Sequence, residues 1–193
     1  MGESLRTFIA IKIIPDKNFL LLFENLRKKL EGESIKWVDV NNFHITLHFF
    51  GNTTQEQVET IKHQFESIGE NFHPFEFSLK GLGYFKKKDE PKILFANIES
   101  SQALNRLAVG VEELIVKLGF EKDGRDFNPH LTLGRIKFLK KRNNFYQVME
   151  KYKEMDIQNV YVPEIIFYKS ILKPSGPVYK PISKIKLLKN ILD

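Results

Sequence analysis

Phe43-His44-Ile45-Thr46-Leu47 and Pro129-His130-Leu131-Thr132-Leu133 follow one pattern, in which a histidine and a threonine alternate with apolar residues. Successive side chains of an extended strand point to opposite faces. The histidine and threonine of each copy are therefore predicted to share one face, while the aliphatic residues enter a core. The second copy begins 86 residues after the first in a chain of 193. This separation is typical of an internal duplication in which each half supplies one strand to a shared site.

Composition limits the classes of protein to consider. Hydrophobic residues make up 42% of the chain, which is enough for a packed core, and cysteine is absent. Disulfides, thiolate catalysis and cysteine-bound metals are thereby excluded. We see no signal-peptide pattern and no apolar run of membrane-spanning length, so we expect a cytoplasmic protein and no membrane partner. The net charge of +6 suits an anionic partner such as nucleic acid.

Two basic runs, Lys86-Lys87-Lys88 and Lys140-Lys141-Arg142, contribute to this charge. They are interpreted either as solvated loops or as walls of a phosphate-binding groove.

Apolar spacing predicts an irregular mixture of strands and helices. Strands are expected at 7–13, 36–40, 44–50, 75–79, 93–98, 130–135, 160–162, 165–172 and 179–188. Helices are expected at 18–30 and 142–154, and two more are expected to run from a cap at 53 to residue 69 and from a cap at 100 or 101 to residue 119. Thr53 and Glu56 fit a capping box. We expect one α+β domain over residues 1–193, with two pseudo-symmetric lobes, antiparallel sheets, outer helices and a central cleft between the two motif strands.

Two imidazoles can hydrolyse a phosphodiester without a metal. One takes a proton from water while the other protonates the leaving oxygen, and hydroxyl donors hold the phosphate as charge moves. Histidine suits both roles because its ordinary pKa lies near neutrality. His44 and His130 are therefore the candidate acid and base, and Thr46 and Thr132 the candidate phosphate donors.

Arg135 is the candidate cation for the phosphate. It lies five residues beyond His130, so a regular strand would turn it to the wrong face. It reaches the site only if the strand bulges near Gly134. Phe49 holds the equivalent position after His44, and its side chain is interpreted either as core packing or as a stacking surface for a nucleobase.

A zinc site is the main chemical alternative. His44 and His48 share strand parity and could join His130 around the metal, although no carboxylate lies at a matching spacing. No serine lies in a nucleophile-elbow pattern, so a serine triad is disfavoured.

The chain resembles the two-histidine HxTx phosphoesterases, and most closely the RNA 2′,3′-cyclic phosphodiesterases of the LigT/ThpR type, formerly called 2′-5′ RNA ligases. The segments that carry the resemblance are 6–11, 42–51, 81–85, 129–135 and 170–179. It implies hydrolysis of an RNA-terminal 2′,3′-cyclic phosphate to a 2′-phosphomonoester, without a cofactor, and a weak reversible 2′-5′ ligation of tRNA halves. It assigns proton donation to the 3′-oxygen to His44, activation of water to His130, and phosphate contacts to Thr46 and Thr132. It also matches Arg135 to an arginine of the family's site.

A nucleotide- or RNA-binding module of the same fold remains the alternative. Binding alone would not require both imidazoles, so the two intact His/Thr pairs favour the enzyme. We expect a monomer that acts on RNA ends.

Overall fold

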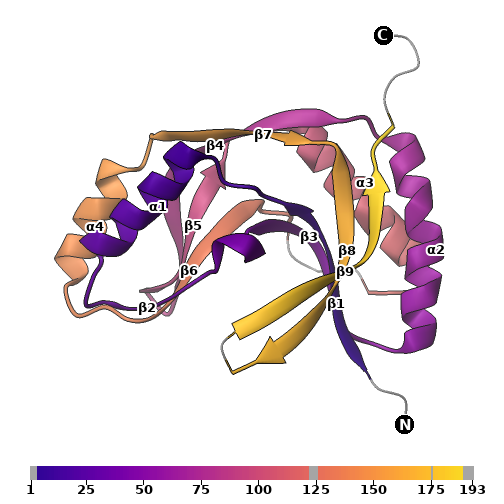
Figure 1. The fold of residues 1–193 in the computed structure, drawn as a ribbon, viewed down its shortest axis with the longest axis horizontal. Helices are drawn as coiled ribbons and strands as arrows, with labels where there is room; N and C mark the ends of the chain where they lie inside the picture. The colour runs from indigo at the N-terminus through magenta and orange to yellow at the C-terminus, as the bar shows by residue number, and fades with distance from the viewer. Residues whose placement is uncertain (1–3, 122–125, 175, 189–193) are drawn as a thin grey trace.

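The computed structural model describes residues 4–121, 126–174 and 176–188 and contains two antiparallel sheets (Figure 1). The strands of these residues are β1 (Leu5–Lys12), β2 (Ser34–Trp37), β3 (His44–Thr53), β4 (Phe75–Lys87), β5 (Glu90–Ile98), β6 (His130–Phe138), β7 (Asp156–Val162), β8 (Glu164–Lys173) and β9 (Gly176–Lys186). The helices are α1 (Lys17–Lys29), α2 (Gln55–Asn71), α3 (Gln102–Lys117) and α4 (Arg142–Lys151), with a 3-10 turn at Val40–Asn42. The predicted α+β class is confirmed.

The two sheets have matching strand orders. The first runs β3-β1-β8-β9 and the second runs β2-β6-β5-β4-β7. Counted outward from the strand with the His-x-Thr motif, β3-β1-β8-β9 corresponds to β6-β5-β4-β7, and β2 is an additional strand at the edge beside β6. The strands β3 and β6 also contact each other, so the two motifs lie where the sheets meet.

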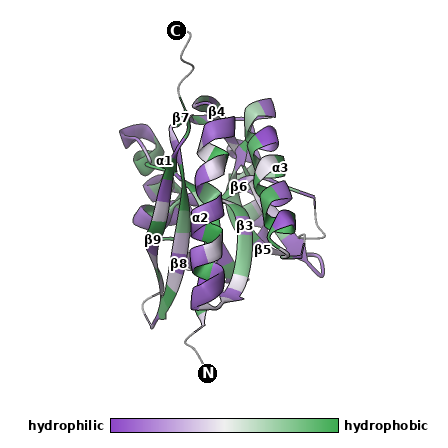
Figure 2. Cartoon of the chain, turned by 90° about the vertical axis from the view of Figure 1, so that its right-hand side faces the viewer, coloured by the Kyte–Doolittle hydropathy of each residue, from purple (hydrophilic) through white to green (hydrophobic). Residues whose placement is uncertain are grey.

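The helices lie on the outer sides of the sheets, as predicted. Figures 1 and 2 show α2 and α3 over the first sheet, where α2 contacts β9 and α3 contacts β3. Figure 1 shows α1 and α4 together beside the second sheet. Each helix buries one apolar stripe, as expected for an amphipathic surface helix; the stripe of α2 consists of Val58, Ile61, Phe65 and Ile68, with Gly69 beside them.

The predicted start of α2 is wrong by one residue. Thr54 is the cap, and it forms a reciprocal capping box with Gln57 rather than the predicted pair of Thr53 with Glu56. Thr53 still belongs to β3, where its hydroxyl is buried and donates to the carbonyl of Leu5 at 2.9 Å. The strand therefore continues through Gly51, which has a φ of +74°, instead of ending there.

Other boundaries also differ from the predictions. The segments 75–79 and 81–85 form one long strand, β4, that runs into the basic residues Lys86 and Lys87. Lys88 and Asp89, both with positive φ, make the turn to β5. Helix α4 ends at Lys151, three residues before the predicted end. Among the described residues, no helix combines the length and apolarity needed to cross a membrane.

Candidate active site

Both motif histidines are held by the same hydrogen bond. The Nδ1 atom of His44 lies 2.6 Å from the carbonyl oxygen of Asn42, and that of His130 lies 2.8 Å from the carbonyl oxygen of Asn128. A carbonyl can only accept, so each Nδ1 carries the hydrogen. Each neutral ring therefore has Nε2 as its proton acceptor, and each protonated ring has Nε2–H as its donor.

Aromatic side chains fix the plane of each imidazole. The ring of His44 lies 5.1 Å from the ring of Phe8 and 5.1 Å from that of Tyr179, measured between centroids. The ring of His130 lies 4.8 Å from Phe85 and 5.3 Å from Phe95. Each histidine thus has two aromatic neighbours from its own sheet, which limits rotation of the ring.

A bulge in β6 brings Arg135 to the side of His130. Thr132 lies opposite Phe95, but Gly134 lies opposite Leu94, so the residue between them is extra in the pairing. The extra residue reverses the alternation of side chains beyond it. The sequence predicted that Arg135 would reach the site only through such a bulge, and the bulge lies where it was required.

A second bulge lies at the matching place in β3. Thr46 lies opposite Ala10 and His48 lies opposite Ile9, so the residue between them is again extra. Phe49 is consequently on the same face as Thr46, with 48% of its surface exposed. This exposure excludes its interpretation as a core residue.

The same bulge turns His48 away from His44. His48 is buried, and its ring lies 4.7 Å from the ring of Phe50. The zinc alternative relied on equal parity for the two histidines and is therefore wrong in its proposed set of ligands. No group of three or more histidine or acidic side chains is placed to hold a metal within residues 4–121, 126–174 and 176–188.

Electrostatic coupling links the motif of one sheet to that of the other. Burial lowers the pKa of His44 below its ordinary value of 6.5, the carbonyl of Asn42 opposes this shift, and the charges of His130 and Arg135 lower the pKa further. Burial also lowers the pKa of His130, which Asn128 opposes and Arg135 reinforces. Both rings therefore favour the neutral form before an anion binds.

Sequence reasoning assigned no role to Tyr179 of β9, whose ring contacts that of His44. The side-chain amide of Asn42 donates to the carbonyl of Pro177 at 2.9 Å, and this bond holds the start of β9 beside the first motif. Burial raises the pKa of the Tyr179 phenol, whereas the charges of Arg135 and Arg6 lower it. The only sequence signal was the presence of Tyr179 in the segment 170–179, of which Ser175 lies outside the described residues.

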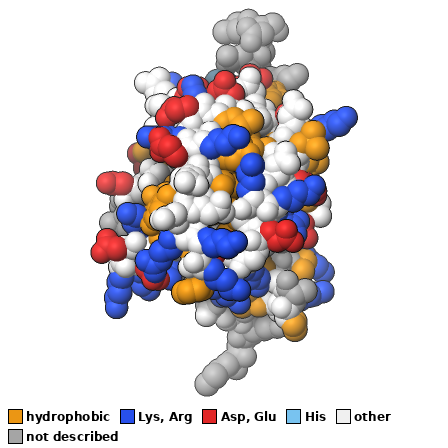
Figure 3. Space-filling view, turned by 90° about the vertical axis from the view of Figure 1, so that its left-hand side faces the viewer, with side chains coloured by type: hydrophobic (Ala, Val, Ile, Leu, Met, Phe, Trp, Pro, Cys, Tyr) orange, Lys and Arg blue, Asp and Glu red, His pale blue; other side chains and the backbone are white. Residues whose placement is uncertain are grey.

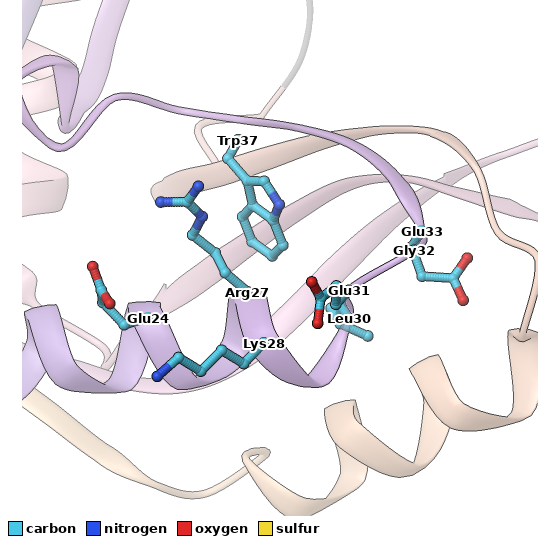
Figure 4. Close-up of a pocket in the computed structure, with 8 residues that line it drawn as sticks. All are labelled: Glu24, Arg27, Lys28, Leu30, Glu31, Gly32, Glu33 and Trp37. Carbon is cyan, nitrogen blue, oxygen red and sulfur yellow. The ribbon is translucent and has the colours of Figure 1, made fainter.

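A hollow beside α1 is separate from the histidines. It has a volume of about 420 Å³, and Figure 4 shows Arg27 of α1 extending beside the indole of Trp37 in its wall. Trp37 packs on the opposite face of β6 from Arg135, since an added Cβ at Gly134 would lie 3.3 Å from the indole. This hollow is therefore on the helix side of the second sheet.

The basic run Lys140–Arg142 has a structural explanation. Arg142 donates to the carboxylate of Glu90 at 2.7 Å, and the main-chain N–H groups of Lys140 and Lys141 donate to Glu33. Figure 3 shows that on this side of the molecule Lys and Arg side chains are interspersed with Asp and Glu. These contacts favour a structural role for the run over a wall of a phosphate groove.

Curated relatives match the chain over most of its length. The RNA 2′,3′-cyclic phosphodiesterase of Archaeoglobus fulgidus is 32% identical over 179 residues, which are 92% of this chain and 98% of the relative. A protein of the same name from Thermotoga maritima is 31% identical over 178 residues, 91% of this chain and 92% of its own length.

Solved structures share the fold. A protein of Thermus thermophilus superimposes with a TM-score of 0.74 at 25% identity and covers 95% of this chain and 98% of its own. Escherichia coli LigT complexed with 3′-AMP also gives a TM-score of 0.74, at 19% identity over 97% of this chain and all of its own.

The family model for LigT-like phosphoesterases matches residues 12–95 and 97–179. Each matched segment contains one His-x-Thr motif, and the two motifs meet where the sheets contact. The chain therefore belongs to the LigT-like phosphoesterase family.

Proposed function

We propose that this protein hydrolyses the 2′,3′-cyclic phosphate at the end of an RNA chain to a 2′-phosphomonoester. His130 takes a proton from water, whose oxygen bonds to phosphorus. The bond from phosphorus to the 3′-oxygen breaks, and His44 donates a proton to that oxygen. The direction of proton transfer rests on the resemblance of the two motifs to those of the HxTx phosphoesterases.

The observation that carries the proposal is the equal anchoring of the two imidazoles. Each Nδ1–H donates to the carbonyl two residues earlier, so each ring can exchange a proton with substrate only through Nε2. The rings come from different sheets yet are electrostatically coupled. In-line displacement at phosphorus requires an acid and a base on opposite sides, and two such rings provide them.

The surrounding side chains suit a ribonucleotide phosphate. Thr46 and Thr132 would donate to its non-bridging oxygens, and Arg135, coupled to both imidazoles, would neutralise developing charge. The exposed ring of Phe49 would stack on the terminal base. The names of the relatives, RNA 2′,3′-cyclic phosphodiesterases, support the substrate class.

The same chemistry accounts for a weak ligation. When a 5′-hydroxyl of RNA replaces water, attack on phosphorus with loss of the 3′-oxygen leaves a 2′-5′ linkage. Because each proton transfer is reversible, the same two imidazoles serve cleavage of that linkage. Cleaved tRNA halves are RNA ends of this type.

The test is hydrolysis of an oligonucleotide that ends in a 2′,3′-cyclic phosphate, in excess chelator, with enzymatic identification of the product end. We expect a 2′-phosphate. His44→Ala and His130→Ala should each lower kcat by about 10²- to 10⁴-fold, the usual contribution of one acid or base. His63→Ala is the matched control, because His63 is exposed on α2 and should retain full activity.

Three outcomes would contradict the proposal. Loss of activity in chelator would require a metal, and full activity in either motif variant would remove that imidazole from the mechanism. Nucleotide binding without turnover in the unaltered protein would favour the binding module.

A further inference from the structure

A row of polar side chains crosses the first sheet on the face that carries His44. Asn52 of β3 lies opposite Arg6 of β1, Arg6 lies opposite Ser170 of β8, and Ser170 lies opposite Tyr179 of β9. Residues directly opposite in neighbouring strands share a face. The contact between Tyr179 and the ring of His44 identifies this face as the one with the motif. We call Asn52, Arg6, Ser170 and Tyr179 the polar row.

The polar row lies beyond Phe49 when viewed from the motif. A second register shift in β3 follows Phe49, so Thr46, Phe49 and Asn52 reach the same face at intervals of three residues instead of two. Thr46 is opposite Ala10, and Arg6 is four residues further along β1, or about 13 Å at ~3.3 Å per residue. This face therefore presents a hydroxyl beside the imidazole, then an aromatic ring, then the polar row.

Arg6 is oriented along this face. Its guanidinium carbon lies 5.4 Å from the centroid of the Phe49 ring, in the geometry of a cation–π contact. Burial raises the pKa of Tyr179, and the charges of Arg135 and Arg6 both lower it, so both guanidinium groups lie within electrostatic reach of the phenol. Burial lowers the pKa of His44 and Arg135 lowers it further, whereas Arg6 lies about 13 Å along β1 from Ala10, the partner of Thr46. Arg6 is thus near the site but outside the reacting centre.

We propose that Arg6 and the polar row bind the 5′-phosphodiester of the terminal nucleoside, the group that joins it to the rest of the RNA. This inference rests on the proposed function. With the cyclic phosphate at Thr46 and the nucleoside on Phe49, the next anion along the chain reaches the polar row. A guanidinium can bind a phosphate through two parallel N–H donors, and amide and hydroxyl groups can donate further hydrogen bonds to its oxygens. The enzyme then acts preferentially on polynucleotide ends rather than on free nucleoside cyclic phosphates.

The experiment compares two substrates with the same terminal nucleoside and cyclic phosphate. One is a nucleoside 2′,3′-cyclic phosphate with a free 5′-hydroxyl, and the other is the corresponding dinucleotide. For Arg6→Gln we expect kcat/KM to fall by about 10- to 100-fold on the dinucleotide, the usual effect of one charge-assisted contact, and by much less on the mononucleotide. For this variant, the slope of log kcat/KM against log salt concentration on the dinucleotide should also be shallower by about 0.7, the value for one phosphate contact in a single strand.

Arg106→Gln is the matched control because Arg106 is exposed on α3, behind the same sheet. It should leave both substrates and the salt slope unchanged. Arg6→Lys should recover only part of the loss, because an ammonium cannot make the two parallel bonds. An equal loss on both substrates, or no loss on either, would overturn the inference.

Binding separates this inference from the proposed reaction. A nucleoside 2′-monophosphate and its 5′-phosphorylated form are compared by calorimetry, which requires no turnover. The 5′-phosphate should tighten binding to the unaltered protein, and Arg6→Gln should abolish that advantage. If the 5′-phosphate gives no advantage to the unaltered protein, the polar row is not a phosphate subsite, whether or not hydrolysis occurs.

Discussion

Arg135 sets the charge around both imidazoles. Its guanidinium adds to the effect of burial in lowering the pKa of His44 and of His130. On the proposed mechanism, kcat/KM requires neutral His130 and protonated His44 in the free enzyme, which gives a bell-shaped pH profile. Because both pKa values are lowered, we expect the maximum of kcat/KM on the acid side of 6.5, the ordinary pKa of histidine.

Arg135→Gln should move that maximum to higher pH. Removing a positive charge makes protonation of each imidazole easier, so both pKa values rise and both limbs of the bell move upward. The height of the profile should also fall, since the phosphate loses a cation. The control is Lys137→Gln, which removes an exposed cation from the same strand. A pH maximum that stays in place in Arg135→Gln would show that its charge does not act on the imidazoles.

Single residues show how far the sequence could predict this site. The placement of the two His/Thr pairs and the condition for Arg135 to reach the site followed from strand alternation alone. His48 was misplaced because alternation was carried through a bulge that only the pairing with β1 reveals. Arg6 was missed for the same reason, since its partners Asn52 and Ser170 are remote in sequence and are joined to it only by the sheet.

Gly69 shows why the end of α2 could not be predicted from the local sequence. Its position near the end of a helical pattern predicted the end of α2, but the helix continues to Asn71. A Cβ at position 69 would lie 2.5 Å from the carbonyl oxygen of Lys186 in β9 and 2.7 Å from the side chain of Ile185. Glycine is therefore required by the close approach of helix to strand. The sequence near residue 69 could not predict this, because Ile185 and Lys186 are distant in the chain.

This contact reverses the usual effect of replacing a helical glycine. At an exposed position the change to alanine stabilises a helix by about 1 kcal/mol. Gly69→Ala should instead destabilise the protein by about 1–3 kcal/mol, because α2 must move from β9. Urea unfolding measures the difference, with exposed Glu70→Ala as the control, which should stay within about 0.5 kcal/mol. Unchanged or increased stability in Gly69→Ala would mean that α2 moves away at no cost.

At the scale of the whole molecule, we propose that residues 1–193 form one domain that arose by internal duplication. The matched family segments, the matching strand orders and the bulge after each threonine support this proposal. The halves are nevertheless interleaved. Figure 1 shows indigo β1 beside orange β8, so the first sheet contains strands from both ends of the chain. Local patterns predicted the strands but not this order, because strand order depends on contacts between distant segments.

Interleaving predicts a single cooperative unfolding transition. Trp37, the one tryptophan, reports on the second sheet through its fluorescence, whereas circular dichroism reports on the whole chain. Phe167→Ala removes a fully buried ring from β8 of the first sheet and should cost about 3–5 kcal/mol. Both probes should shift by the same amount in urea. A shift in circular dichroism with an unchanged fluorescence transition would show that the sheets unfold separately.

The place of β1 inside the first sheet also has a consequence for synthesis on the ribosome. Ala10 pairs on one side with Thr46 but on the other with Ile166, which is 156 residues further along the chain. At ~5–20 residues per second, the partner emerges on the order of ten seconds after β1. During that interval the apolar strand Phe8–Ile11 has one open edge, which is the kind of surface that aggregates. Aggregation through that edge is therefore a hazard for the nascent chain until β8 has been made.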